Sequence, residues 1–206
     1  MKIISSSKIE QLLKETICSF QNTHAFPPFW ICTRKEKVDF RSSSKEMVKQ
    51  NVQLAIRLAK QGHVVVIPLI FYHCQQDYEK SIPHEHSSNH YVDLHYNILL
   101  IYYSNGIVFE RYEPHSTLLQ GNFASELEKL FAQFSEEKIS FQLFAEKGLQ
   151  TLNKDKLCGH HILYWISQRL KFGKKVTQFE FIQRREETYK KFIIFAEQID
   201  KKLIRN

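Results

Sequence analysis

A hairpin signal in the middle of the chain constrains the fold more than any other feature of the sequence. Two apolar, aromatic runs, residues 94–103 and 107–112, flank an Asn-Gly pair at 105–106. Asn-Gly between such runs predicts a tight turn that joins two antiparallel strands. The turn brings the start of the first strand beside the end of the second. His95 and Glu113 occupy those two ends, so we expect them to come close together.

Hydrophobic spacing predicts the other elements of the chain. Apolar residues at helical spacing predict helices, and β-branched or alternating runs predict strands. The predicted helices cover 7–21, 43–62, 122–135, 158–172 and the segment from 177 onward, and the predicted strands cover 63–71 and 139–145. Because the strands are mostly consecutive, this order favours an α+β fold, a central mixed β-sheet flanked by helices.

Local signals place several boundaries. The tetrapeptides 7–10, 43–46 and 177–180 have the capping-box pattern that is typical of helix starts. Pro27 and Pro28 predict an irregular packed connection over 22–41. Pro68 lies within the predicted strand 63–71, where a proline calls for an edge position or a bulge.

The length and composition suit one domain. The chain has 206 residues, of which 43% are hydrophobic, which is enough to bury a core. We expect a single domain, 1–206, made of an N-terminal helical part (1–61), a catalytic core (62–172) and a C-terminal helix (173–206). No apolar run is long enough to cross a membrane, and the first residues turn polar too soon for a signal peptide.

Charge and cysteine spacing bound the partners and the compartment. The net charge is +7, yet no stretch has the basic-aromatic pattern of a nucleic-acid module, so a lysine-rich solvated surface is the favoured interpretation. The four cysteines, at 18, 32, 74 and 158, fit no disulfide framework or metal knuckle. A reducing compartment such as the cytoplasm is therefore expected.

The segment around Cys158 carries the strongest chemical signal. A polar loop runs into this cysteine, and an apolar helical pattern follows at once, which places Cys158 at the N-terminus of a helix. Free backbone N–H groups and the helix dipole at that end favour an anion such as a thiolate. Cys158 is therefore a candidate nucleophile.

A cysteine hydrolase also needs a base, a group that orients the base, and donors for the oxyanion. His95 is the candidate base, and Glu113 is the carboxylate that would accept from one ring nitrogen and orient the other. Gln150 precedes Cys158 and is the candidate oxyanion donor, together with the backbone N–H of Cys158. His90, in the preceding loop, is the rival base.

At these residues the chain resembles the clan CE cysteine peptidases. That family comprises the SUMO and ubiquitin-like-protein proteases, the adenovirus maturation protease, and related enzymes of large DNA viruses and bacterial effectors. The resemblance covers roughly residues 62–172. It rests on four segments, Val65-Val66-Ile67-Pro68-Leu69, His95-Tyr96-Asn97-Ile98-Leu99-Leu100-Ile101, Phe109-Glu110-Arg111-Tyr112-Glu113-Pro114-His115, and Gln150 to Gly159.

The resemblance implies a papain-like or adenain-like fold with the nucleophile at a helix N-terminus. It implies the roles of nucleophile for Cys158, base for His95, orienting group for Glu113 and oxyanion donor for Gln150. It also implies a substrate cut after Gly-Gly-type sequences, either a ubiquitin-like modifier or a viral polyprotein, and no cofactor. The chain departs from the family where Tyr96 replaces a common Trp and where two histidines, at 160–161, replace small residues.

Two other functions remain open. Bacterial effectors with a similar His/Glu/Cys order are protein acetyltransferases that use acetyl-CoA and inositol hexakisphosphate, and the basic surface suits a polyanion. The third hypothesis is a catalytically inactive module that binds a ubiquitin-like modifier. Activation by the polyanion would identify the second, and an unreactive Cys158 the third.

Two further features have ordinary explanations. Residues 73–90 hold His73, Cys74, His84, Glu85, His86 and His90. Imidazole and thiolate suit zinc, but the spacing matches no zinc module, so a loop of solvated histidines is favoured and no metal is expected. The basic residues of the last helix are interpreted as its solvated face, with docking of an acidic partner as the alternative.

Overall fold

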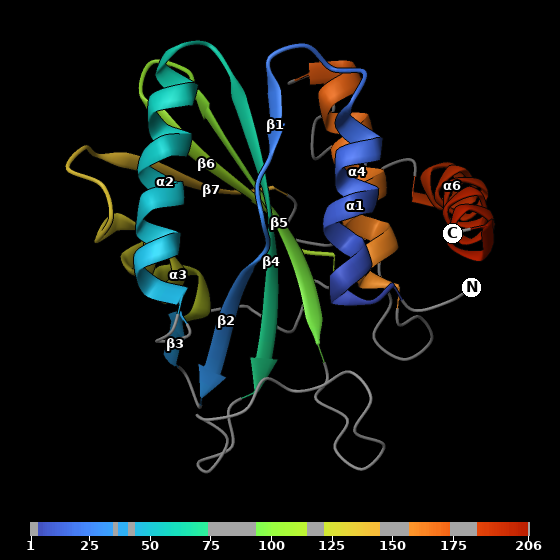
Figure 1. Cartoon of the computed structure of the whole chain (residues 1–206), viewed down its shortest axis with the longest axis horizontal. Coiled ribbons are helices and arrows are strands. Elements are labelled where there is room, and N and C mark those ends of the chain that lie inside the picture. The colour runs from blue at the N-terminus through green and yellow to red at the C-terminus, as the bar shows by residue number, and fades with distance from the viewer. Residues whose placement is uncertain are drawn as a thin grey trace.

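The computed structural model describes residues 4–34, 37–40, 44–73, 94–114, 122–144, 157–173 and 185–205. A seven-stranded mixed sheet lies between two groups of helices (Figure 1). The helices are α1 (Ser6–Ile17), α2 (Lys45–Lys60), α3 (Asn122–Ala132), α4 (Cys158–Phe172) and α6 (Arg185–Arg205). The strands are β1 (Thr23–Ala25), β2 (Phe29–Arg34), β3 (Lys37–Phe40), β4 (Val64–His73), β5 (His95–Tyr103), β6 (Ile107–Tyr112) and β7 (Ile139–Phe144). The predicted α+β class with a mixed central sheet is confirmed.

The strand order is β3-β2-β4-β5-β6-β7, with β1 paired to β4. β5 pairs antiparallel with both β4 and β6, whereas β7 is parallel to β6. The predicted hairpin is present: β5 and β6 pair around a turn in which Asn105 has φ 55° and Gly106 has φ 137°. Both values lie in the left-handed region that Asn and Gly tolerate best.

The prediction for residues 22–41 is wrong. This segment forms β1, β2 and β3, and both β1 and β2 run parallel to β4. Pro27 and Pro28 interrupt the segment between β1 and β2 without removing it from the sheet. β4 is a central strand, so an edge position for Pro68 is also wrong. Pro68 lies between the residues that pair with β1 and those that pair with β2, where the neighbouring strand is broken.

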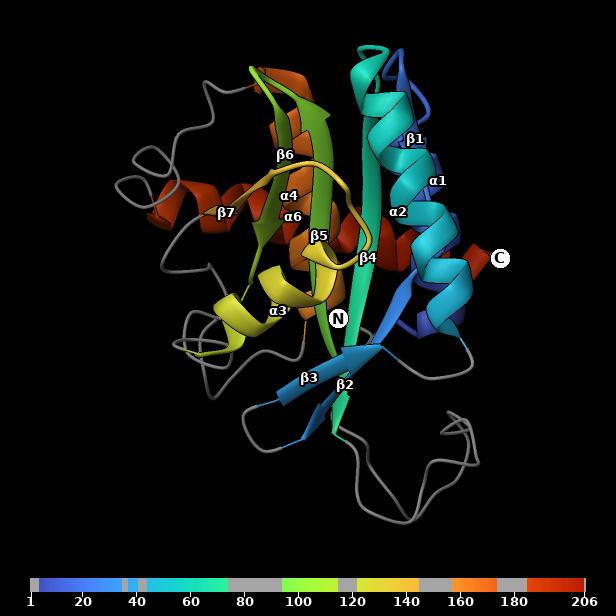
Figure 2. The ribbon, with the colours of Figure 1, turned by 90° about the vertical axis from the view of Figure 1, so that its left-hand side faces the viewer.

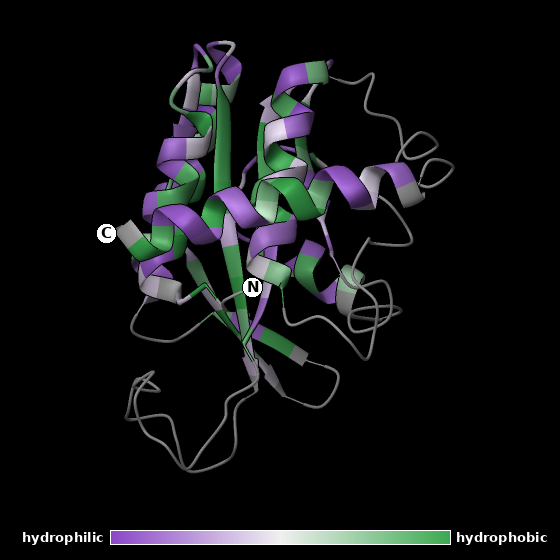
Figure 3. Cartoon of the chain, turned by 90° about the vertical axis from the view of Figure 1, so that its right-hand side faces the viewer, coloured by the Kyte–Doolittle hydropathy of each residue, from purple (hydrophilic) through white to green (hydrophobic). Residues whose placement is uncertain are grey.

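The two faces of the sheet support separate cores. Helices α2 and α3 cover one face (Figure 2), and α1, α4 and α6 cover the other. Alternate residues of β5 supply both cores, since Leu99 and Ile101 face α2 whereas Ile98 and Leu100 face α4. Figure 3 shows α6 lying across the outer side of this second group, with hydrophobic and hydrophilic stretches alternating along it.

The structure differs from the sequence-based predictions at the helix starts and at one cysteine. Helix α1 begins at Ser6 with Ser5 as its N-cap and has no side-chain cap hydrogen bond, so the capping box at 7–10 is wrong. Helix α2 has Ser44 as its N-cap, and Ser43, the first residue of the box at 43–46, lies outside the described residues. The tetrapeptide 177–180 lies outside the described residues.

Cys18 and Cys158 are free thiols, but Cys32 is disulfide-bonded, so the expectation of a chain without disulfides is wrong at Cys32. Among the described helices, none has the length and apolar character to cross a membrane.

A buried ion pair fixes α4 to the hairpin. Arg169 of α4 donates from Nε to Glu110 Oε1 at 2.7 Å and from Nη2 to Oε2 at 2.9 Å. Tyr102 of β5 donates its hydroxyl to the same carboxylate at 2.8 Å, and the guanidinium lies 5.7 Å from the Tyr102 ring centroid. Glu110 and Arg169 are 5% and 8% exposed, so each charge depends on the other.

Replacing one partner of this pair should therefore unfold the protein readily. Arg169→Met leaves Glu110 buried without its cation, and we expect a loss of about 3–5 kcal/mol in the free energy of unfolding. The control is Lys60→Met, which removes the half-exposed Lys60–Glu137 pair and should cost less than about 1 kcal/mol. Denaturant unfolding of both variants measures the difference. Equal losses would show that the buried pair does not hold α4.

Candidate active site

Three of the sequence-predicted site residues converge at one end of β5. His95 is the first residue of β5, Glu113 follows the last residue of β6, and Cys158 is the first residue of α4. Ile98 pairs with Tyr112, so one step further Glu113 comes opposite residue 97 and diagonal to His95. His95 Nε2 and Glu113 Oε1 are 2.5 Å apart. The hairpin therefore brings the imidazole and the carboxylate together as the Asn-Gly turn predicts.

The imidazole of His95 lies between an acid and a thiol. Its Nε2 contacts Glu113, and the ring also hydrogen-bonds the Cys158 side chain. Burial alone would lower the pKa of His95, but the Glu113 carboxylate and the Cys158 side chain outweigh burial and raise the pKa to about 10. The side chains of His95 and Glu113 are 14% and 5% exposed. The site is thus shielded from bulk water and favours a protonated imidazole.

Cys158 is held by the start of its helix. The backbone N–H of His161 donates to the Leu157 carbonyl at 3.0 Å, which closes the first turn of α4. The helix begins without a side-chain cap, so its first turn presents backbone N–H groups near the sulfur. Such groups stabilise an anion at this position.

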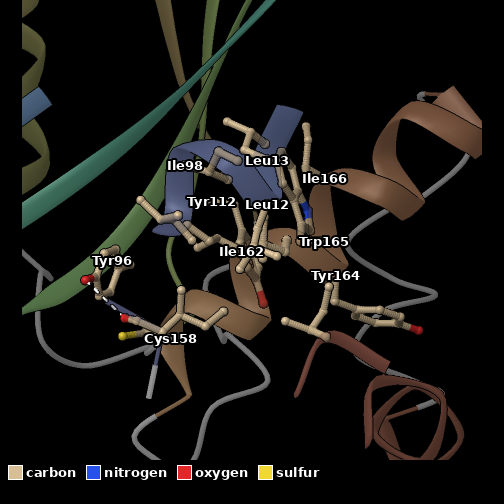
Figure 4. Close-up of a cluster of buried hydrophobic side chains, with 14 of the residues drawn as sticks. Leu12, Leu13, Tyr96, Ile98, Tyr112, Cys158, Ile162, Tyr164, Trp165 and Ile166 are labelled. Carbon is tan, nitrogen blue, oxygen red and sulfur yellow. Dashed lines mark hydrogen bonds between the residues drawn. The ribbon is translucent and has the colours of Figure 1, made fainter. Parts of the chain in front are cut away.

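The N-terminal segment forms one wall of the site. Ile4 is 2% exposed and packs against Gly159, where an added Cβ would lie 3.3 Å from Ile4 Cβ. Its carbonyl accepts a 3.4 Å hydrogen bond from the Tyr96 hydroxyl (Figure 4). Ile4 therefore contacts the residues that follow both His95 and Cys158. No sequence signal predicts this contact, since nothing in the residues around Ile4 indicates where they pack.

The two histidines at the start of α4 face the C-terminal helix. His160 is fully buried, and its Nε2 lies 3.1 Å from Asp200 Oδ1. Burial lowers the pKa of His160, and Asp200 partly opposes that shift. The His161 ring stacks on Phe192 with centroids 3.9 Å apart. His160 and His161 thus bind α6 to α4.

Sequence reasoning also missed a buried polar pair behind Glu113. Arg111 Nη1 donates to Asn97 Oδ1 at 3.1 Å and lies 3.9 Å from Glu113 Oε2. Both residues occur inside apolar strand patterns. The only available signal was a charged residue and an amide interrupting those patterns near the strand ends.

Some predicted site residues cannot be placed. Gln150, the rival base His90 and most of the histidine-rich segment 73–90 lie outside the described residues. In the part of the chain that is described, no group of three or more His, Cys, Asp or Glu side chains is arranged to hold a metal ion.

Comparison with known proteins yields matches only among solved structures. No protein-family profile matches the sequence, and no curated protein matches it. The RavZ effector of Legionella pneumophila matches with a TM-score of 0.49 and 10% identity over 85% of this chain and 57% of that chain. The ASFV pS273R protease matches with a TM-score of 0.47 and 14% identity over 92% of this chain and 66% of that chain. This chain thus spans less than two thirds of either structure, and likenesses of this size say nothing of its activity.

Proposed function

We propose that the chain is a thiol peptidase with a Cys158–His95–Glu113 triad. The observation that carries the proposal is the position of the His95 ring. One ring nitrogen contacts Glu113, and the ring also hydrogen-bonds the Cys158 side chain. A nucleophile, a base and an orienting acid in contact form the constellation of cysteine hydrolases. The resemblance to clan CE peptidases assigns the same roles to the same residues.

The proposed reaction proceeds through an acyl-enzyme. The Cys158 thiolate attacks the scissile carbonyl, and the imidazolium of His95 protonates the leaving amine as the C–N bond breaks. Water then loses a proton to His95, attacks the thioester and releases the acid, so that Cys158 is regenerated. Glu113 keeps the imidazole oriented through both steps.

The oxyanion of each tetrahedral intermediate needs donors. The backbone N–H of Cys158 lies at the uncapped start of α4, which suits it to this task. The Gln150 side chain is proposed as the second donor, on the resemblance alone. The same resemblance supports a substrate cut after Gly-Gly, in a ubiquitin-like modifier or a polyprotein, with no cofactor.

Electrophilic probes test this proposal. Ubiquitin and SUMO carrying a C-terminal propargyl group are incubated with the wild type, with Cys158→Ala and with Cys18→Ala. Cys18 is an exposed free thiol and serves as the matched control. We expect one modifier to form a covalent adduct with the wild type and with Cys18→Ala, and none with Cys158→Ala. An adduct lost in Cys18→Ala instead would refute Cys158 as the nucleophile.

A negative result with every probe is also informative. Iodoacetamide then compares Cys158 with Cys18 within the wild-type protein, since an activated thiolate reacts faster than an ordinary exposed thiol. A slower or equal rate at Cys158 would support the inactive binding module. A faster rate would direct the search to a polyprotein peptide, or to acetyl transfer with added inositol hexakisphosphate.

The pKa of His95 sets an expectation for pH dependence. Because the imidazolium persists to about pH 10, protonation of the leaving group should fail only above that pH. Glu113→Gln removes the charge that raises the pKa, so the His95 titration should move down by about one unit or more. NMR titration of the imidazole measures both proteins, with the exposed Glu137→Gln as control. Equal midpoints in wild type and Glu113→Gln would contradict the assigned cause.

A further inference from the structure

We propose that Arg111, held by Asn97, is a positioning residue that keeps Glu113 an oriented carboxylate and supplies the second positive charge of the buried site. This inference rests on the proposed peptidase function and deepens it. If Arg111 has this role, the site consists of five side chains in series rather than three. They are Asn97, Arg111, Glu113, His95 and Cys158.

The contacts run without a break through these side chains. Asn97 Oδ1 accepts from Arg111 Nη1 at 3.1 Å, and the same nitrogen lies 3.9 Å from Glu113 Oε2. The other oxygen of that carboxylate, Oε1, is the one 2.5 Å from His95 Nε2. Glu113 thus has the imidazole in contact with one carboxylate oxygen and the guanidinium at ion-pair distance, longer than a hydrogen bond, from the other.

Burial makes this arrangement costly. Asn97 is 0% exposed, Arg111 is 1% exposed and Glu113 is 4% exposed. Among the described residues, Nε and Nη2 of Arg111 and Nδ2 of Asn97 have no hydrogen-bond partner, even though each atom is buried. Unsatisfied buried donors cost folding free energy, and a native protein rarely keeps several in one place without a reason.

The neighbouring positions show what stability alone would select. On the same face, Arg111 lies opposite Leu99 in the β5–β6 ladder and two residues from Phe109, and both of these are fully buried apolar residues. An apolar residue at 111 would complete that core without unsatisfied donors. The guanidinium is therefore retained for its effect on Glu113, the acidic group that forms an ion pair with it in the described part of the chain.

Charge balance explains what Arg111 contributes. When the site is ready to react, Cys158 and Glu113 are both anionic and His95 is the cation that they share. Arg111 adds a second cation, which makes the buried group neutral. Burial lowers the pKa of Arg111 and Glu113 opposes that shift, consistent with a guanidinium that depends on this carboxylate.

The other ionisable groups near the strand ends lie apart from this set. Glu110 is the neighbour of Arg111 in β6, so it points to the opposite face of the sheet, where it pairs with Arg169 and Tyr102. Between α4 and the strand ends, His95 and Cys158 are the titratable groups in contact with Glu113 or with each other. Removing Arg111 therefore leaves two buried anions with one cation, which favours uptake of a proton at this site.

The test is the pH profile of alkylation at Cys158. Iodoacetamide rates are measured from pH 4 to 10 by mass spectrometry of the Cys158 and Cys18 peptides, so that Cys18 reports the behaviour of an ordinary thiol in the same sample. In Arg111→Met the rise of the Cys158 rate should move up by about one pH unit, which makes alkylation about tenfold slower below the midpoint. The Cys18 profile should not move.

Two further variants separate charge from structure. Arg111→Lys keeps the cation, so its profile should stay with the wild type, a rescue that a purely structural role would not give. Asn97→Ala keeps the charge but releases its orientation, so the rate should fall several-fold with the midpoint unchanged. If Arg111→Met does not fold, these two variants test the proposal by themselves. A shifted midpoint of the Cys158 alkylation profile in Arg111→Lys would overturn it. An unchanged Cys158 alkylation rate in Asn97→Ala would also overturn it.

The outcome also distinguishes this inference from the function beneath it. A wild-type Cys158 that reacts no faster than Cys18 would overturn both. A wild-type Cys158 that is activated, with the same profile in Arg111→Met, would overturn the role of Arg111 alone and leave the triad standing.

Discussion

The antiparallel pairing of β5 with β6 is the interaction on which the rest of the site depends. It places the carboxylate that follows β6 against the imidazole that begins β5. It also presents Glu110 to α4, where Arg169 binds it and fixes the helix that begins with Cys158. One hairpin thus positions two members of the proposed triad directly and the third through a buried ion pair at the far end of α4.

Strand β6 carries this double task because successive side chains point to opposite faces. Glu110 reaches one core and ties down α4, whereas Arg111 reaches the other and lies behind Glu113. A slip of one residue in the pairing would exchange the two faces and remove both contacts at once. The register of the hairpin, set at Asn105 and Gly106, is therefore under a stronger constraint than the apolar pattern alone imposes.

The sequence predicted the parts of the fold that depend on local signals. The hairpin turn and the hydrophobic period located β5, β6, α2 and α4 and brought His95 near Glu113. It failed where a long-range partner overrides a local signal. Pro27 and Pro28 predicted an irregular connection, but the strands on either side of them, β1 and β2, both pair in parallel with β4. Ile4 and Arg111 escaped notice because only the assembled fold shows what buries them.

The first turn of α4 is enclosed by contacts that are distant in sequence. Ile4 packs on Gly159, and Asp200 and Phe192 hold the two histidines that follow. None of these contacts exists until α1 and α6 have both docked, and each requires a large loop to be closed first. The geometry around the sulfur therefore depends on both α1 and α6 being docked. Thiol reactivity at this position would report whether both outer helices are in place, which makes it a sensitive indicator of partial unfolding.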